Sequence, residues 1–374
     1  MNCAATAPAR YAPENELQPP VMPDTSAIAP KLLPWFEAHG RRHLPWQHDP
    51  APYRVWVSEV MLQQTQVATV FPYYRRFMSS FPTVEALAAA ALDEVLHVWT
   101  GLGYYARARN LHWAARIVVE CHGGRIPEDI ATLQTLPGIG RSTAGAILSL
   151  SRSQRHPILD GNARRVLARY FAVEGHLGQP GTYRTLWALA DACTPPERVA
   201  DYTQAIMDLG STVCTRATPA CDACPLRDGC VARATGRTRE LPSRRPTRAR
   251  PRRQAVALIV ARPDGAVLLE ERPREGLWGG LWSLPMFESE QAATTWCEQQ
   301  FGALEAPAEV LPAYEHAFTH FDLTLRPLVV QIDAGGRLPD RHRWYTGKER
   351  IGLSKPAVQL IKNLTEGHAV APKP

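Results

Sequence analysis

A hairpin of proline and glycine is the feature that most constrains how this chain folds. Residues 136–140 read Leu-Pro-Gly-Ile-Gly, and a pattern of small apolar residues follows from Arg141 to about Ser151. Proline and glycine are costly inside a helix, so this segment marks a tight turn that opens the next helix. The first N–H groups of that helix lack partners, and Gly138 and Gly140 leave space beside them. The sequence therefore predicts a phosphate-binding turn.

An aspartate, Asp160, follows this turn twenty residues after its last glycine. It lies between the apolar run 157–159 and Gly161-Asn162, which opens another predicted helix. One interpretation is an N-cap, whose carboxylate accepts hydrogen bonds from the start of the helix. The other is a catalytic carboxylate. Position alone leaves the two equal, and the nearby turn favours catalysis because it would hold a DNA backbone close by.

A glutamate, Glu59, occurs on an apolar helix face. In the helix predicted after Pro52, the spacing of Val55, Glu59 and Leu62 places all three on one side. Such a glutamate is commonly a rim residue paired with an arginine. Alternatively, desolvation keeps the carboxyl protonated and ready to act as an acid. The side-chain amides that follow at 63–66 suit hydrogen bonds to base edges.

Two further loops carry residues suited to contact a base. The segment 41–46 contains Arg42 and Trp46, which either dock a helix or line a pocket for an aromatic ring. Two glycines in the turn 99–105 present Leu102 and Tyr104. These side chains either join the core or wedge into a base stack.

Four of the eight cysteines cluster in a compact loop, Cys214-x6-Cys221-x2-Cys224-x5-Cys230. The length of the chain and the absence of a secretory signal argue against a disulfide framework. On spacing alone, a zinc knot and a [4Fe–4S] cluster are equal candidates.

Charge is concentrated in one segment. The formal net charge is +6, yet residues 233–253 contain nine arginines and one glutamate. This segment is expected to be a flexible linker that adds sequence-independent affinity for DNA. The Ala- and Pro-rich residues 1–29 are expected to be a disordered tail. No run of eighteen apolar residues indicates a membrane span.

With these residues assembled, the chain resembles the endonuclease-III-like, helix-hairpin-helix superfamily of DNA glycosylases, and within it the MutY-type adenine DNA glycosylases. The resemblance is carried, in order, by VSEVMLQQTQV (57–67), WTGLGYYARARN (99–110), LPGIGRSTAGAI (136–147), ILDGNARRVLAR (158–169) and the four-cysteine loop. It spans about residues 30–232.

The resemblance implies an all-α, bilobal catalytic region followed by an α/β domain. A six-helix barrel would occupy 52–155. The second lobe, 30–51 plus 156–232, would hold one structural [4Fe–4S] cluster on Cys214, Cys221, Cys224 and Cys230. The linker 233–253, a Nudix-like domain at 254–365 and a tail at 366–374 would complete the chain.

The resemblance also implies residue roles. Glu59 would protonate adenine at N7, and Asp160 would stabilise the oxocarbenium-like sugar, with Asn162 in the same site. Arg42 and Trp46 would surround the extruded adenine. The residues that would contact the DNA are Gln64, Leu102, Tyr104, Gly138, Gly140, Ser142 and Thr143. Bifunctional relatives carry a lysine at the position of Ser142, so we expect a monofunctional enzyme without strand cleavage.

The C-terminal part has the short β-patterned runs of an α/β domain and resembles the Nudix-like domain of MutY proteins. The acidic signature of active Nudix hydrolases is absent, so we expect no pyrophosphatase activity. The resemblance assigns recognition of 8-oxoguanine to Phe318, Thr319 and His320, where threonine replaces the family's usual serine.

The leading hypothesis is therefore excision of adenine from A:8-oxoguanine or A:G mispairs in double-stranded DNA after base flipping. We expect a monomer that acts in the cytoplasm at the nucleoid if the source is bacterial, with no membrane partner. Two alternatives remain: a related glycosylase that removes thymine from G:T mismatches, and a catalytically inactive DNA-binding scaffold.

Overall fold

The computed structural model describes residues 24–176, 178–243, 249–304, 306–333 and 338–365. The expected tails lie largely outside these ranges, as do residues 244–248 of the expected linker. The chain forms two compact units. The first consists of Met1–Ala89 and Asn110–Pro246, and the second of Ala90–Arg109 and Thr247–Pro374.

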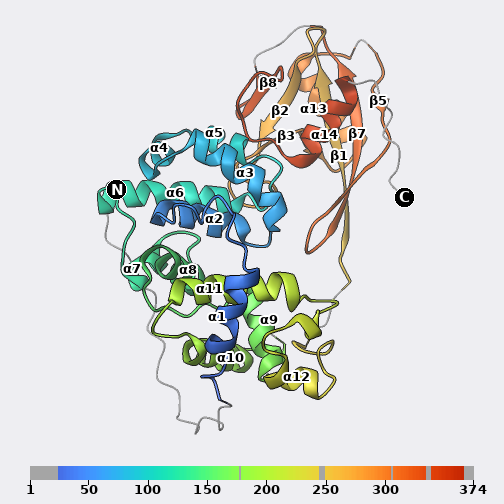
Figure 1. Ribbon diagram of the computed structural model, residues 1–374. Coiled ribbons are helices and arrows are strands. Elements are labelled where there is room, and N and C mark those ends of the chain that lie inside the picture. Colours follow the sequence, from blue (N-terminus) through green and yellow to red (C-terminus); the bar gives the residue numbers. More distant parts are fainter. Residues whose placement is uncertain (1–23, 177, 244–248, 305, 334–337, 366–374) are drawn as a thin grey trace. The chain divides into compact units, whose positions relative to one another are not determined.

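The first unit is helical (Figure 1). Proline occupies the first turn of α2 and of α10, where its missing N–H costs nothing. The helices are α1 (Ile28–His39), α2 (Pro52–Leu62), α3 (Val67–Ser80), α4 (Val84–Ala89), α6 (Ala106–His122, whose first residues belong to the second unit), α7 (Ile130–Thr135), α8 (Arg141–Arg152), α9 (Gly161–Tyr170), α10 (Pro180–Cys193), α11 (Val199–Asp208) and α12 (Val231–Ala234).

One apolar core joins the start of this unit to its later helices. Ile28 and Leu32 of α1 are fully buried against residues of α9, α10 and α11. Three cysteines of the 214–230 loop, Cys214, Cys224 and Cys230, pack against the same core. The helix that carries Asp160 and the cysteine loop are therefore supported by one set of apolar contacts.

The second unit contains a mixed sheet whose strands are mostly short. The described strands are β1 (Arg252–Ala261), β2 (Val267–Glu271), β3 (Trp282–Ser283), β4 (Met286–Phe287), β5 (Glu309–Val310), β6 (Tyr314–Ala317), β7 (Asp322–Gln331) and β8 (His342–Tyr345). Its main strand order is β3-β2-β1-β7-β5. In addition, β4 pairs with β1, β6 with β7 and β8 with β2. Strands β1 and β7 run parallel from Arg252↔Asp322 to Ala261↔Gln331.

Alternation along β1 assigns its side chains to two cores, one on each face of the sheet. Ala257 and Ile259 belong to the core that includes Ala357 and Leu360 of α14 (Lys355–Thr365). Their neighbours along the strand belong to the core that includes residues of α13 (Glu290–Phe301). Figure 1 shows the two helices beside this sheet. The unit is thus a helix–sheet–helix domain, in agreement with the predicted α/β class.

The second unit also includes α5 (Leu92–Trp99) and the turn after it. The sequence analysis placed this segment inside the 52–155 lobe, whereas its contacts group it with the C-terminal residues. Within the described ranges, none of the helices combines the length and apolar character that a membrane span requires.

Candidate active site and its surroundings

The predicted phosphate-binding turn is formed at the start of α8. Gly138 has a φ of +81°, and the Ile139 N–H donates to the Leu136 carbonyl at 3.1 Å. Gly140 is the N-cap of α8, and a Cβ built on it would meet no atom within 4 Å. The space beside Gly140, at the start of α8, is therefore open, as an anion site there requires.

Ser142 in the first turn of α8 holds the segment that leads to Asp160. Its hydroxyl oxygen accepts a hydrogen bond from the Leu159 N–H at 3.0 Å. From the other side, Arg164 Nε donates to the Leu159 carbonyl at 2.9 Å. Both backbone groups of the residue before Asp160 are thus fixed by side chains.

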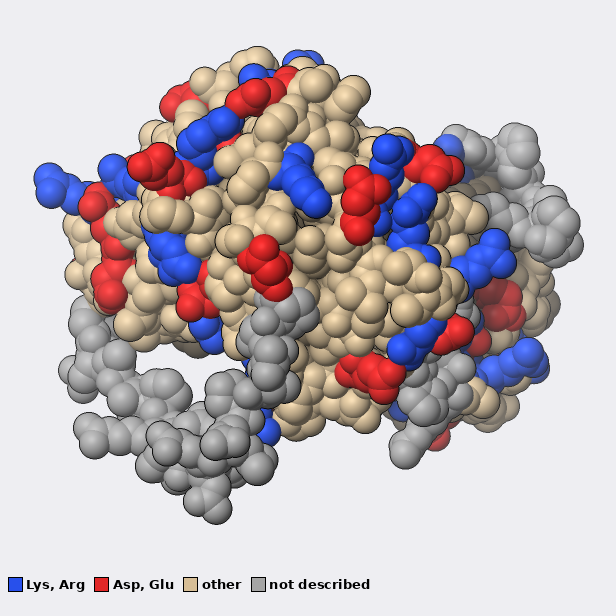
Figure 2. Space-filling model, turned by 60° about the horizontal axis from the view of Figure 1, so that its bottom comes forward, with Lys and Arg blue, Asp and Glu red and all other residues tan. Residues whose placement is uncertain are grey.

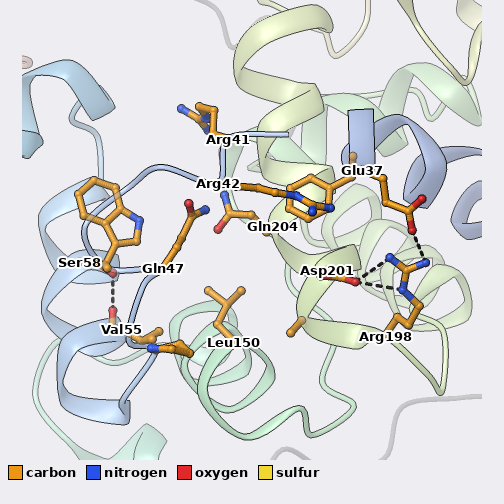
Figure 3. A pocket seen from close by; sticks show the side chains of 14 residues that line it. Glu37, Arg41, Arg42, Gln47, Val55, Ser58, Leu150, Arg198, Asp201 and Gln204 are labelled. Atoms are coloured by element: carbon orange, nitrogen blue, oxygen red, sulfur yellow. Dashed lines mark hydrogen bonds and ion pairs between the residues drawn. The ribbon is translucent and has the colours of Figure 1, made fainter. Parts of the chain in front are cut away.

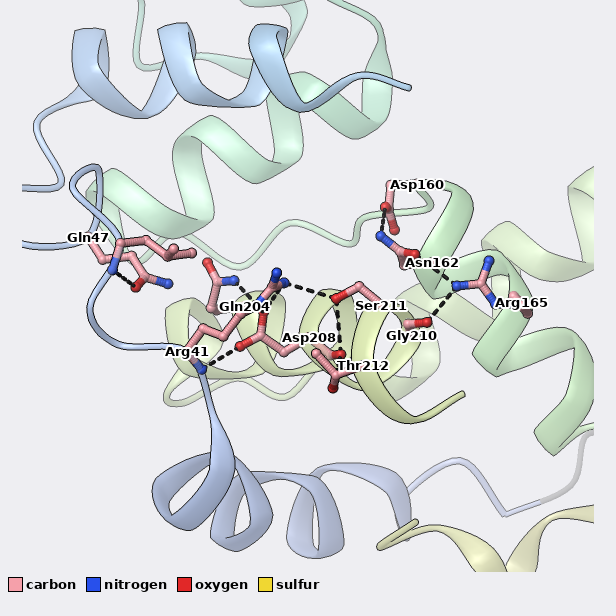
Figure 4. A network of polar contacts seen from close by, with 11 residues as sticks. Arg41, Gln47, Asp160, Asn162, Arg165, Gln204, Asp208, Gly210, Ser211 and Thr212 are labelled. Carbon is pink, nitrogen blue, oxygen red and sulfur yellow. Dashed lines mark hydrogen bonds and ion pairs between the residues drawn. The ribbon is translucent and has the colours of Figure 1, made fainter. Parts of the chain in front are cut away.

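Asp160 is the N-cap of α9, and its carboxylate also contacts Asn162. Oδ1 accepts from the Ala163 N–H at 2.8 Å, and Oδ2 accepts from Asn162 Nδ2 at 3.1 Å (Figure 4). Arg165 Nη2 in turn donates to Asn162 Oδ1 at 2.8 Å and to the Gly210 carbonyl at 2.6 Å. The capping role is therefore real, and it fixes the carboxylate without excluding a catalytic role.

Glu59 lies near Asp160 in an apolar environment. It is half-buried on α2, between the buried residues Ser58 and Val60. Burial and, to a lesser extent, the negative charge of Asp160 together raise the pKa of Glu59 to about 8. The two carboxyls are thus close enough to interact, and Glu59 is protonated at neutral pH.

The residues after Glu59 connect α2 to the phosphate-binding turn. Gln63 Nε2 donates to the Thr143 hydroxyl at 3.3 Å, which ties the end of α2 to the start of α8. Gln64 is exposed and has a φ of +58°, a left-handed conformation that is uncommon outside glycine. Its amide is therefore available at the surface beside the turn.

Arg42 and Trp46 line a cavity of about 600 Å³ (Figure 3). Trp46 is buried and packs edge-on against Tyr74 at 5.2 Å between ring centroids. Arg42 lies over the Phe36 ring at 5.2 Å. Neither Glu59 nor Asp160 is among the described residues that line the cavity, although Ser58 is.

A buried ion pair that the sequence analysis missed holds the 41–46 loop in place. Asp208, at the end of α11, is 1% exposed and accepts bonds from the Arg41 N–H at 2.8 Å and Arg41 Nε at 2.9 Å (Figure 4). Gln204 Nε2 donates to the same carboxylate at 2.9 Å, and Gln204 also lines the cavity. A lone aspartate in an otherwise apolar helix end was the signal that could have identified this network.

The four clustered cysteines line one small cavity. Cys214, Cys221, Cys224 and Cys230 border it, together with three arginines that include Arg169. Arg169 Nη1 donates to Cys214 Sγ at 3.3 Å. Among the described residues, no group of His, Cys, Asp or Glu side chains is arranged to hold a single metal ion. The thiols therefore surround a shared space and do not converge on one point.

In the second unit, the turn after α5 contains the two residues that were predicted to contact the base stack, and they differ in exposure. Leu102 is only 5% exposed and belongs to the interior, whereas Tyr104 is 45% exposed. Tyr104 has a φ of +49° and follows Gly103, whose φ is +80°. Of the two, Tyr104 is therefore the residue that can reach a partner without rearrangement.

The predicted 8-oxoguanine-recognition residues form the tip of the β6–β7 hairpin. The Phe318 N–H donates to the Phe321 carbonyl at 2.8 Å, and the two rings stack at 4.5 Å. Thr319 and His320 are exposed between them. Arg250 Nη1 donates to the Phe318 carbonyl at 3.2 Å, so a cation lies at the base of this tip.

Some arginines of the arginine-rich segment form ion pairs with carboxylates. Arg237 pairs with Glu174 at 2.9 Å and with Glu240 at 3.2 Å, and Arg250 pairs with Asp322 at 3.3 Å. Basic and acidic side chains are also interspersed over the face seen in Figure 2. Less of the local positive charge is thus available for DNA than the composition suggests.

Comparison with known families identifies the class of protein. The family model described as "HhH-GPD superfamily base excision DNA repair protein" matches residues 57–192. A second model, described as a NUDIX domain, matches residues 256–363. The structure titled as a thermostable thymine-DNA glycosylase is 26% identical, covers 56% of this chain and 97% of its own, and has a TM-score of 0.52.

Curated relatives narrow this class. The adenine DNA glycosylase of Buchnera aphidicola subsp. Acyrthosiphon pisum is 33% identical over 89% of this chain and 96% of its own length. That of Rattus norvegicus is 36% identical over 95% of this chain and 82% of its own. The chain therefore belongs to the adenine DNA glycosylase family of base excision repair enzymes.

Proposed function

We propose that this chain is a monofunctional glycosylase that flips adenine out of double-stranded DNA and excises it opposite 8-oxoguanine or guanine. The observation that carries the proposal is the neutral Glu59 carboxyl beside the Asp160 carboxylate. Adenine is a poor leaving group as an anion and a good one once protonated, so the reaction needs one carboxyl of each kind.

In this mechanism Glu59 gives its proton to N7 of the flipped adenine. The bond between N9 and C1′ then breaks, its electron pair goes to the neutral adenine, and positive charge develops on the sugar. Asp160 stabilises that charge, and a water molecule adds to C1′ and gives its proton to the Glu59 carboxylate, which restores the acid. The bonds from Ala163 and Asn162 keep the carboxylate oriented toward the sugar throughout the reaction.

The surrounding residues bind the adenine and the DNA. Arg42 and Trp46 would contact the purine ring of the adenine that is flipped toward Glu59 and Asp160. The residues that would contact the duplex, its backbone or the opposite base are Gln64, Tyr104, Gly138, Gly140, Ser142 and Thr143. Phe318, Thr319 and His320 would recognise 8-oxoguanine. For a bacterial source, we place this activity at the nucleoid in the cytoplasm.

A [4Fe–4S] cluster fits the cysteine cavity. Four thiols surround a shared space, as one ligand per iron requires, and three arginines there would offset the negative charge of a thiolate-bound cluster. Cys214, Cys221, Cys224 and Cys230 would hold it, and it would stabilise the fold near DNA. We expect iron and sulfide to be lost from a Cys214→Ser variant and retained in a Cys121→Ser control.

The test is single-turnover cleavage of duplexes that contain A:8-oxoguanine, A:G, G:T or C:G. Release of adenine from the first two alone supports the proposal. Release of thymine from G:T would support the alternative of a thymine glycosylase. Binding without release of any base would support an inactive scaffold. Glu59→Gln and Asp160→Asn variants should bind the duplex and lose at least a hundredfold in rate.

A further inference from the structure

We propose that the C-terminal domain positions the turn 101–104, so that Tyr104 and the 8-oxoguanine-recognition residues act together to recognise the base opposite the adenine. The inference deepens the proposed function and rests on it, because both parts are assigned to the same mispair. It concerns contacts within the second unit, which contains α5, this turn and the mixed sheet.

Polar contacts fix α5 to the sheet domain at both of its ends. The Asp93 carboxylate, in the first turn of α5, accepts a hydrogen bond from Trp282 Nε1, with both oxygens at 3.3 Å. Toward the other end, His97 Nδ1 lies 3.3 Å from the Ile351 carbonyl oxygen. Two contacts this far apart along one helix set its direction as well as its position.

A glycine allows the two backbones to approach between these contacts. A Cβ built on Gly352 would lie 2.4 Å from Leu96 Cβ and 3.0 Å from Leu281 Cδ2. Leu96 and Leu281 are both fully buried, so neither side chain can move into solvent. The close packing of α5 on the domain therefore depends on the absence of a side chain at position 352.

A tyrosine connects the turn itself to the domain. The Tyr105 hydroxyl donates to the Leu353 carbonyl at 3.4 Å and accepts from the Gly101 N–H at 3.1 Å. A few residues later, Arg109 Nη1 donates to the Gly279 carbonyl at 2.5 Å. The turn is thus held on either side by groups that also contact the C-terminal domain.

The turn has a conformation that its surroundings must maintain. Gly101, Gly103 and Tyr104 all have positive φ, at 97°, 80° and 49°. A non-glycine residue in this region is strained and persists where neighbouring contacts impose it. If α5 is displaced from the domain, the exposed Tyr104 side chain should therefore change direction. The carboxyls of Glu59 and Asp160 belong to the first unit and should be affected less.

The first test is Gly352→Val in the full-length chain, with single-turnover rates on A:8-oxoguanine and A:G duplexes. We expect at least a tenfold fall in the ratio of the two rates, with the A:G rate changed less than threefold. The matched control is Gly181→Ala, where an added Cβ meets no atom within 4 Å. An unchanged ratio, or an equal fall in both rates, would overturn the inference.

A second variant addresses a possible folding defect of Gly352→Val. Tyr105→Phe removes one hydroxyl and keeps the ring, and we expect it to lower the same ratio by a smaller factor. Combining Tyr105→Phe with Tyr104→Ala should lower the ratio no further than Tyr104→Ala alone. If the two substitutions instead lower the ratio by independent factors that multiply, the two residues do not act through one turn.

Hydrogen exchange separates failure of this inference from failure of the proposed function. In Gly352→Val, backbone amides of residues 92–105 should exchange faster than in the wild-type chain, with no change in α9. If the wild-type chain releases adenine from neither duplex, the proposed function fails on its own assay. Unchanged exchange at 92–105 would refute the positioning contacts whatever the activity.

Discussion

The hydroxyl of Ser142 and the backbone N–H of Leu159 form a hydrogen bond of 3.0 Å. This bond joins the first turn of α8 to the residue directly before Asp160. The side chain at position 142 is therefore adjacent to the predicted site of sugar chemistry, where a longer side chain would point toward the same region.

The first prediction concerns a lysine at this position. In Ser142→Lys the amine should attack C1′ as adenine departs. The C1′–O4′ bond then breaks to open the sugar ring and give an imine, which borohydride reduces to a stable protein–DNA adduct. Arg141→Lys, at the exposed neighbouring position, is the matched control and should give none. Failure of Ser142→Lys to form an adduct, with adenine release retained, would show that position 142 is misplaced relative to the sugar.

The second prediction concerns Gly210, which contacts a proposed catalytic residue. A Cβ on Gly210 would lie 2.6 Å from Asn162 Cβ and 2.9 Å from the Asn162 carbonyl oxygen. Gly210→Ala should therefore displace Asn162 and lower the single-turnover rate about tenfold or more. Gly181→Ala should leave the rate unchanged. Equal rates for both variants would mean that the position of Asn162 does not matter.

The third prediction concerns stability. Asp208 is fully buried and bonded to Arg41, so Asp208→Ala should leave that guanidinium without its partner. We expect the free energy of unfolding to fall by about 3 kcal/mol. The exposed pair Arg155–Asp191 provides the control, since Asp191→Ala should cost less than about 1 kcal/mol. Urea unfolding of each variant measures both values, and similar losses would contradict a structural role for the buried pair.

The fourth prediction links Glu59 to the pH dependence of stability. Its pKa is raised to about 8, so between about pH 4.5 and 8 the folded chain binds more protons than the unfolded chain. This contribution to stability is therefore lost as pH rises through that window. Glu59→Gln should be more stable than the wild type at pH 8.5 and gain less at pH 5. The exposed Glu120→Gln should show no such difference; an equal one would contradict the shift.

Much of the fold could be predicted because local chemistry determines it. Pro52 lacks a backbone N–H, which suits the first turn of a helix, and the 136–140 hairpin directly precedes a helix whose first N–H groups have no partners. Both helices form as expected. Glu59 and Asp160 could be proposed as site residues because a carboxyl among apolar residues and one at a helix start are visible in the sequence.

The remainder depends on contacts between distant segments. The bond between Arg41 and Asp208 joins residues 167 positions apart, and the aspartate at an apolar helix end does not indicate which cation pairs with it. The packing of α5 on the C-terminal domain depends on Gly352, whose lack of a side chain carries no local signal. Leu102 was a plausible surface residue in a glycine turn, yet tertiary packing buries it. Two-residue strands such as β3 and β4 are too short to show alternation.

The most direct test of the account is the pH dependence of adenine release from A:8-oxoguanine duplexes under single-turnover conditions. If Glu59 is the acid, the rate should hold at neutral pH and fall about tenfold per pH unit above about pH 8, while Glu59→Gln remains at its low rate at every pH. A wild-type rate that does not change from pH 6 to 10, or a fully active Glu59→Gln variant, would contradict it.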